Sequence, residues 1–160
     1  MNSGIELRLI HIVALGFCFV MGAAQVLGAA PGKPAAATHS AIYFSHQQVA
    51  AGFAKGGYLH PPGGGNYGVM TARRDKAGEV ELHTRDTDVI YVVDGSAAFV
   101  TGGKMIGGRQ TAPDEMRGSS IEGGEVRHIS KGDILIIPAG VPHWFKEVPG
   151  PVLYLVVKVR

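Results

Sequence analysis

Two short stretches of the sequence hold side chains that can bind a metal ion or move protons. Glu81 and His83 lie two residues apart, Asp88 follows five residues later, and His143 lies far along the chain. Residues two apart on an extended strand face the same side, so Glu81 and His83 are expected to point together. Imidazoles and carboxylates are ligands of divalent metals and are also acid–base groups. The pattern therefore predicts a shared site if the fold brings the two stretches together.

Strands and tight turns must position these side chains. Residues 89–93 consist of β-formers, and Asp94-Gly95 is a turn signal that predicts a hairpin with a strand at 97–101. Residues 134–137 form a β-branched, apolar run that ends at Pro138-Ala139-Gly140. Further strands are predicted at residues 67–73, 80–84, 126–130, 143–147 and 152–159.

One short helix is expected near the start of the domain. Ser45 and Gln48 have the spacing of a capping box, and Gly56-Gly57 provides the stop. His60 is expected in a loop. The segment Gly102–Glu125, rich in glycine, is expected to be a long irregular loop, either a lid or a surface insertion.

The two stretches read E-x-H-x4-D-x6-G and G-x5-P-x-G-x2-H-x3-E, and these spacings resemble the two signature motifs of the cupin family. The resemblance implies an all-β fold, an antiparallel jelly-roll barrel over about residues 67–160. In cupins, two histidines and a glutamate of the first motif and one histidine of the second hold a metal. Carried across, Glu81 takes the place of the first histidine, His83 matches the second, Asp88 replaces the glutamate and His143 matches the last.

Three arrangements of these residues remain open. In one, all four bind Mn, Fe or Zn; in another, His83, His143 and one carboxylate form a three-ligand site. In the third no metal binds, and the imidazoles act as acid–base groups beside a carboxylate, as in the metal-free sugar epimerases among cupins. A purely structural alternative is that the two carboxylates form ion pairs, with Arg85, Arg127 or Lys146 as partners.

Other side chains are candidates for substrate contact. Arg85 has the chemistry to bind a carboxylate, Ile90 and Phe145 are expected to line the cavity, and His128 lies on a strand that leaves its direction open.

These features allow three functions. The first is an exported metal-dependent enzyme, an oxidoreductase, lyase or isomerase, that acts on a small organic molecule with Glu81 or Asp88 as catalytic base. The second is a non-enzymatic protein that binds or senses a small ligand, and the third is a metal-free isomerase or epimerase. The resemblance also implies a homodimer.

Composition and the N-terminal sequence set the remaining expectations. A length of 160 residues suits one domain, and a net charge of +2 without a basic patch argues against nucleic-acid binding.

An apolar run followed by small residues predicts a signal peptide at 1–29, an Ala/Pro-rich linker at 30–40 and a domain at 41–160. This predicts a periplasmic or secreted protein without a membrane segment after cleavage, the alternative being an uncleaved anchor. Cys18 lies inside the run, so no disulfide is expected.

Overall fold

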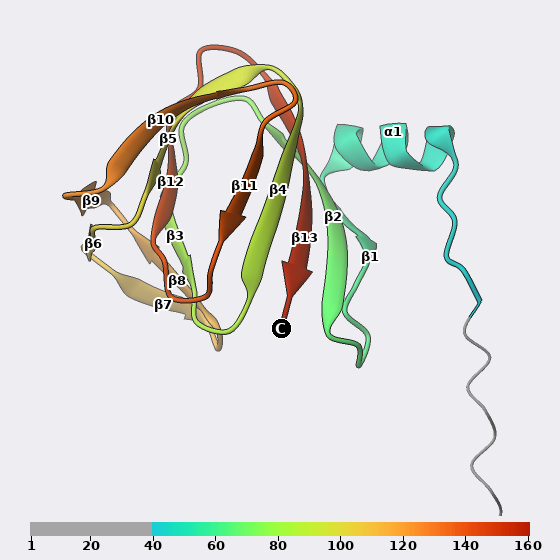
Figure 1. Cartoon of the computed structure of the whole chain (residues 1–160), viewed down its shortest axis with the longest axis horizontal. Helices are drawn as coiled ribbons and strands as arrows, with labels where there is room; N and C mark the ends of the chain where they lie inside the picture. The colour runs from blue at the N-terminus through green and yellow to red at the C-terminus, as the bar shows by residue number, and fades with distance from the viewer. Residues whose placement is uncertain (1–39) are drawn as a thin grey trace, which may run out of the picture. The chain divides into compact units, whose positions relative to one another are not determined.

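Two antiparallel sheets face one another in the computed structural model, which describes residues 40–160 (Figure 1). The predicted signal peptide, all but the last residue of the predicted linker, and Cys18 lie outside the described residues. In chain order the elements are α1 (His46–Lys55), β1 (Gly57–His60), β2 (Tyr67–Arg74), β3 (Val80–His83), β4 (Thr87–Asp94), β5 (Ser96–Thr101), β6 (Lys104–Ile106), β7 (Arg109–Ala112), β8 (Glu115–Gly118), β9 (Ser120–Glu122), β10 (Glu125–Ser130), β11 (Ile134–Ile137), β12 (His143–Glu147) and β13 (Val152–Val159).

From β2 to β5 and again from β10 to β13, successive strands alternate between the two sheets in the manner of a jelly roll. The first sheet has the order β1-β2-β13-β4-β11, and the second has the order β10-β5-β12-β3-β8-β7. A small third sheet pairs β6 with β9. The strand pairings are antiparallel, which confirms the predicted all-β class with one short helix. The two main sheets face each other without joining into a closed hydrogen-bonded ring.

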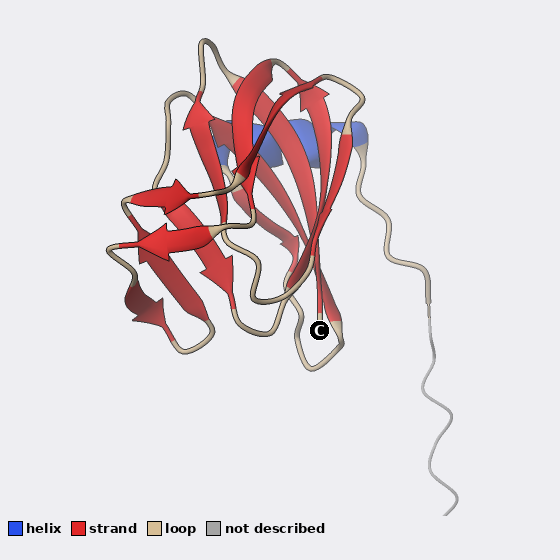
Figure 2. Cartoon of the chain, turned by 60° about the vertical axis from the view of Figure 1, so that its left-hand side comes forward, coloured by secondary structure: helices blue, strands red, loops and turns tan. Residues whose placement is uncertain are grey.

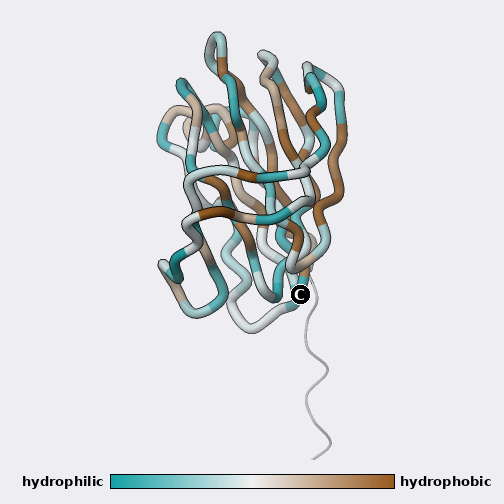
Figure 3. The backbone as a smooth tube through the Cα atoms, turned by 90° about the vertical axis from the view of Figure 1, so that its left-hand side faces the viewer, coloured by the Kyte–Doolittle hydropathy of each residue, from teal (hydrophilic) through white to brown (hydrophobic). Residues whose placement is uncertain are grey.

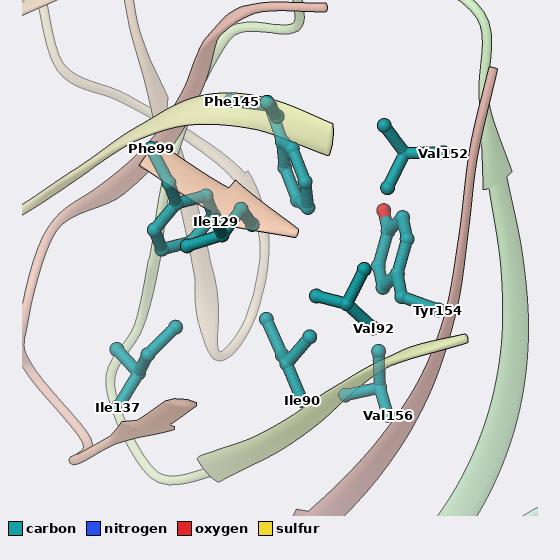
Figure 4. Packing of buried hydrophobic residues seen from close by; sticks show 10 residues of the cluster. Ile90, Val92, Phe99, Ile129, Ile137, Phe145, Val152, Tyr154 and Val156 are labelled. Atoms are coloured by element: carbon teal, nitrogen blue, oxygen red, sulfur yellow. The ribbon is translucent and has the colours of Figure 1, made fainter. Parts of the chain in front are cut away.

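The hydrophobic core fills the space between the sheets. Side chains of Ile90, Val92, Tyr154 and their neighbours in the first sheet point toward Phe99, Phe145 and Ile129 in the second (Figure 4). The rings of Phe99 and Phe145 meet edge to face with centroids 4.7 Å apart. Hydrophobic stretches run along the strands, and most of the bends between them are polar (Figure 3).

The helix forms as the capping pattern predicts. Ser45 accepts a hydrogen bond from the Gln48 backbone N–H at 3.3 Å, and the Ser45 backbone N–H donates to the Gln48 side chain at 2.8 Å. The helix lies outside the sheets (Figure 2) and contacts β2 at Gly52, where an added Cβ would come within 2.7 Å of Thr71 Oγ1. Close packing therefore needs a residue without a side chain at this position.

The segment 102–125 is the main correction to the predicted fold. It is not a long loop, because β6, β7, β8 and β9 occupy most of it. Gly103 and Gly107, with φ of 70° and 62°, turn the chain between strands. β8 pairs with β3, so these strands depend on a partner distant in sequence, which local composition does not reveal.

Two smaller predictions are also wrong. Asp94-Gly95 does not close a hairpin, because β4 pairs with β11 and β13 whereas β5 pairs with β10 and β12. The bend instead carries the chain from one sheet to the other. His60 ends strand β1 and is not in a loop.

Gly95 is expected to be a bend that does not tolerate a side chain. Its φ is +82°, and an added Cβ would lie 2.2 Å from the Pro151 carbonyl oxygen. Gly95→Ala should therefore lower the free energy of unfolding by about 3 kcal/mol, combining left-handed strain with a steric clash. Gly132→Ala is the matched control, since Gly132 has φ +96° and open space around it, and should cost only about 1 kcal/mol. Equal losses in urea unfolding would contradict the role assigned to the Pro151 contact.

Candidate metal centre

The four predicted ligand residues meet at one end of the space between the sheets. His83 is the last residue of β3, His143 is the first residue of β12, and Asp88 lies at the start of β4. Glu81 is directly opposite His143 in the pairing of β3 with β12. The rings of His83 and His143 have centroids 5.3 Å apart. The two stretches of sequence are therefore brought together as predicted.

Glu81, His83 and His143 form the tightest group of potential ligands. One ligand atom from each lies within 4.8 Å of the other two. Glu81 Oε2 is 3.8 Å from His83 Nε2 and 4.0 Å from His143 Nε2. Metal–ligand bonds of about 2.1 Å require neighbouring ligand atoms to be about 3.0–3.4 Å apart. The two distances from Glu81 Oε2 therefore need to shorten by about 0.4–1.0 Å, and the two imidazole nitrogens must also come within that range.

Two arginines determine which oxygen of Glu81 faces the histidines. Glu81 Oε1 accepts hydrogen bonds or ion pairs from Arg74 Nη2 at 3.1 Å and Arg117 Nη1 at 2.6 Å. Arg117 lies opposite Glu81 in the pairing of β8 with β3, and its Nε also donates to Glu115 at 2.7 Å. With Oε1 engaged in this way, Oε2 is left for the side of the imidazoles.

Neighbouring charges shift the pKa values of Arg117 and Glu115. Burial lowers the pKa of Arg117, but Glu81 and Glu115 more than offset this and leave it raised. Burial raises the pKa of Glu115, and the Arg117 guanidinium reverses this to a net lowering. Arg117 and Glu115 are therefore both charged at neutral pH.

Asp88 is held by a lysine on the neighbouring strand. Lys158 is directly opposite Asp88 in the pairing of β13 with β4, and its Nζ lies 2.8 Å and 3.1 Å from the two carboxylate oxygens. Asp88 Oδ2 is 3.3 Å from His83 Nε2 and 3.9 Å from His143 Nε2. Burial raises the pKa of Asp88, but the His83 ring and Lys158 outweigh it, so the pKa is lowered and Asp88 is ionised.

The histidines are prepared to act as ligands. His143 Nδ1 lies 3.2 Å from the Val141 carbonyl oxygen, and donation there leaves the lone pair on Nε2. Burial lowers the pKa of His143, partly opposed by Glu81, so the ring is neutral at neutral pH. His83 Nε2 is buried and makes no hydrogen bond with the described residues. A buried polar atom without a partner is costly, and a metal ion would remove that cost.

A cavity of about 230 Å³ contains this site. Ile90 and Phe145, the two predicted lining residues, both border it, together with Tyr154 and Val156. A second hollow of about 300 Å³ shares His83, Glu115 and Lys158 with it, and Tyr58 and Arg160 line its outer part. The site therefore has an apolar wall on the side of the core and a polar wall toward solvent.

The other two predicted contact residues lie elsewhere. The Arg85 side chain is 64% exposed and lies near Asp114, and Arg85 is not among the residues that line the cavity. His128 is exposed on β10 and borders a different hollow with Ser96 and Glu147. Its neighbour Ile129 takes the core-facing position, so the alternation of the strand turns His128 outward. The structure thus places both residues outside the central cavity.

The ion-pair partners expected from the sequence are wrong. Arg85 pairs with Asp114 and Arg127 pairs with Glu125. The site carboxylates instead pair with Arg74, Arg117 and Lys158.

Two of these three cations have a signal in the sequence. Lys158 continues the inward row of Val152, Tyr154 and Val156, and Arg74 continues the row of Met70 and Ala72, at two-residue intervals. A charge on the core face of a strand indicates a site. Arg117 lies on β8, in the segment predicted to be a loop, so no inward-facing row of residues could be recognised around it.

Removing the cation that holds Asp88 should destabilise the metal-free protein. Lys158→Met leaves a buried carboxylate without its partner, and the free energy of unfolding should fall by about 3 kcal/mol. The control Arg109→Met breaks the exposed pair with Glu79 and should cost at most about 1 kcal/mol. Combining Lys158→Met with Asp88→Asn should recover part of the loss. A double variant less stable than Lys158→Met would argue against a charge effect.

The lowered pKa of Asp88 also predicts a pH dependence in the metal-free protein. Because the folded state holds the proton less tightly than the unfolded state, ionised Asp88 contributes stability above the ordinary aspartate pKa of about 4. That contribution disappears as the pH falls through the lower pKa of the folded state. In urea unfolding between pH 2 and 6, Asp88→Asn should show a weaker loss of stability on acidification than the native chain. Parallel curves would contradict this assignment.

Comparison with known proteins agrees with this geometry. The family model described as Cupin matches residues 62–159. No curated protein matches the chain.

Several solved structures are similar to this chain. A protein from Neisseria meningitidis matches with a TM-score of 0.50 and 10% identity, over 74% of this chain and 100% of that chain. The EutQ protein of Clostridium difficile matches with a TM-score of 0.43 and 16% identity, over 65% of each chain. The DMSP lyase of Ruegeria pomeroyi matches with a TM-score of 0.46 and 17% identity, over 66% of this chain and 46% of that one.

This chain thus covers less than two thirds of the Clostridium and Ruegeria proteins, and at these identities the structural likeness concerns the fold alone. The family match is different, because it extends over most of the domain and includes both motifs that carry Glu81, His83, Asp88 and His143. The chain belongs to the cupin family.

Proposed function

We propose that this cupin binds a divalent metal through Glu81, His83 and His143 and acts on a small organic molecule in the central cavity. One observation carries the proposal: Glu81 Oε2 lies close to both imidazole Nε2 atoms, while Glu81 Oε1 and His143 Nδ1 are each engaged by another group. His83 Nε2 supports it as well, because this buried atom makes no hydrogen bond with the described residues, although Asp88 Oδ2 lies 3.3 Å away, and an ion would satisfy it.

The donor set favours Mn, Fe(II) or Zn. Two imidazole nitrogens and one carboxylate oxygen suit these ions better than soft Cu(I). Three protein ligands also leave positions for water or a substrate, as in catalytic sites. Asp88 is a fourth donor only if its Oδ2 turns from His83 toward the ion, since Lys158 holds the carboxylate.

The chain's own residues would orient and shield the reacting molecule. A divalent ion at this site would supply Lewis-acid polarisation of a bound oxygen. The lowered pKa makes Asp88 a weak base, so this carboxylate suits a fixed negative charge beside the ion, held by Lys158, better than proton abstraction. Ile90 and Phe145 form the apolar wall that excludes water from one side of the cavity.

A metal-free acid–base function is the second candidate. The contact of 3.3 Å between His83 Nε2 and Asp88 Oδ2 is the arrangement that such a reaction would use. Incorporation of solvent deuterium into candidate sugars or keto acids by metal-free protein would support it. A protein that binds metal and ligand without turnover would instead be a binding or sensing module.

Metal content provides the direct test. After reconstitution with Zn²⁺ or Mn²⁺ and removal of excess ion, the native chain should retain about one equivalent by elemental analysis. His83→Ala and His143→Ala should each weaken binding at least tenfold in calorimetric titration, because each removes one of three ligands. His128→Ala removes an exposed imidazole outside the cavity and should bind as the native chain does. Equal metal in all four proteins would refute the site.

Export is proposed from the N-terminal sequence alone. The mass of the protein recovered from the periplasm or medium tests it. A mature chain beginning after residue 24 or residue 29 is expected.

A further inference from the structure

We infer that the metal-loaded cavity selects a small carboxylate anion and that Arg117 is the residue that recognises it. This inference rests on the proposed function, because the charge argument requires a divalent ion. It is carried by the charges that line the cavity, by the position of Arg117 and by the size of the space.

The cavity is electrically balanced only while it holds no ion. Three cations, Arg74, Arg117 and Lys158, line it together with three carboxylates, Glu81, Asp88 and Glu115. With both imidazoles neutral, as metal binding requires, these charges cancel. A divalent ion therefore leaves an excess of two positive charges in a partly buried space, where unbalanced charge is costly. An anionic ligand offsets that excess, whereas a neutral ligand does not and a cation adds to it.

Arg117 and Arg74 already form a site for a carboxylate oxygen. Their guanidinium groups converge on Glu81 Oε1 at 2.6 Å and 3.1 Å. Glu81 thus shows how these two residues hold an oxyanion at the edge of the proposed metal site. Arg74 Nε is also buried without a hydrogen-bond partner among the described residues, so the pair has donor capacity that Glu81 does not use.

Arg117 is the better placed of the two to turn toward a ligand. Its second partner, Glu115, has 30% of its side chain exposed, and Glu115 also borders the outer hollow. Breaking a partly exposed ion pair costs little, so a carboxylate entering from that hollow can take the place of Glu115. Arg74 is more constrained, because its guanidinium lies 4.7 Å from the centroid of the Phe145 ring.

The central cavity, without the outer hollow, has room for a ligand of a few carbon atoms. A cavity of about 230 Å³ equals the liquid volume of roughly seven or eight water molecules. Ile90, Phe145 and Val156 provide an apolar surface for the carbon part of the ligand. A short mono- or dicarboxylate satisfies both the charge and the size.

The test compares acetate and succinate with their neutral amides, acetamide and succinamide, by calorimetric titration of Zn²⁺-loaded and metal-free protein. At least one carboxylate should bind the loaded protein tenfold or more tightly than the metal-free protein, and the matching amide should bind at least tenfold more weakly than that carboxylate. A carboxylate that binds no more tightly than its amide would overturn the inference. Failure of both carboxylates to bind would do the same.

Variants identify the recognising residue. At a Zn²⁺ concentration that saturates the metal site of each variant, Arg117→Met should weaken carboxylate binding at least tenfold, and Arg117→Lys should give an intermediate loss, because the charge remains without the planar fork. Arg109→Met is the matched control, since Arg109 is opposite Arg117 on β7 but pairs with exposed Glu79, and it should bind as the native chain does. Circular dichroism checks the fold of each variant. Native-like carboxylate binding by folded Arg117→Met would exclude Arg117.

The Zn²⁺ measurement separates failure of the metal site from failure of carboxylate recognition. Zn²⁺ affinity is measured first on each protein. If the native chain does not bind Zn²⁺ or Mn²⁺, the proposed function fails and this inference fails with it. If the chain binds the ion but neither carboxylate, only the inference is overturned.

Discussion

The candidate site depends on the clamp that Arg74 and Arg117 form around one oxygen of Glu81. A carboxylate in the place where related cupins have a histidine has two equivalent oxygens and a free rotation. The two guanidinium groups remove that freedom by engaging Oε1, which leaves Oε2 facing both imidazoles. Without this clamp, Glu81 would be an acidic side chain near two histidines and not a positioned donor.

The sheets supply the rigidity that the clamp requires. Glu81 pairs with Arg117 on one neighbouring strand and with His143 on the other, and Lys158 pairs with Asp88 in the facing sheet. These are cross-strand neighbours whose separation is determined by the hydrogen-bonded ladder. The hydrophobic core beside them, including Phe99 and Phe145, packs the two sheets against each other. Buried charges are thereby tolerated, because each carboxylate has its cation within ion-pair distance.

Much of the fold and the centre of the site were predictable from local pattern. Alternation of apolar residues and turn signals located the helix and most strands, and the motif spacing identified Glu81, His83, Asp88 and His143. The cationic half of the site was not predicted. Arg117 lies on β8, within a glycine-rich segment whose strands exist because β3 pairs with one of them. The turn signal at Asp94-Gly95 predicts a hairpin where the chain instead crosses between the sheets, because a turn signal does not specify which strands pair.

The sequence by itself determined which chemical groups are available and which of them share a strand face, because two-residue periodicity and turn chemistry are local properties. It also determined the family, through motifs whose glycines, proline and histidines have fixed spacing. Only the tertiary structure decided which oxygen of Glu81 faces the histidines, that Asp88 is bound to Lys158, and that His128 points away from the cavity. Those outcomes depend on strand pairing between residues distant in the chain, and pairing is settled by the packing of the two sheets as a whole.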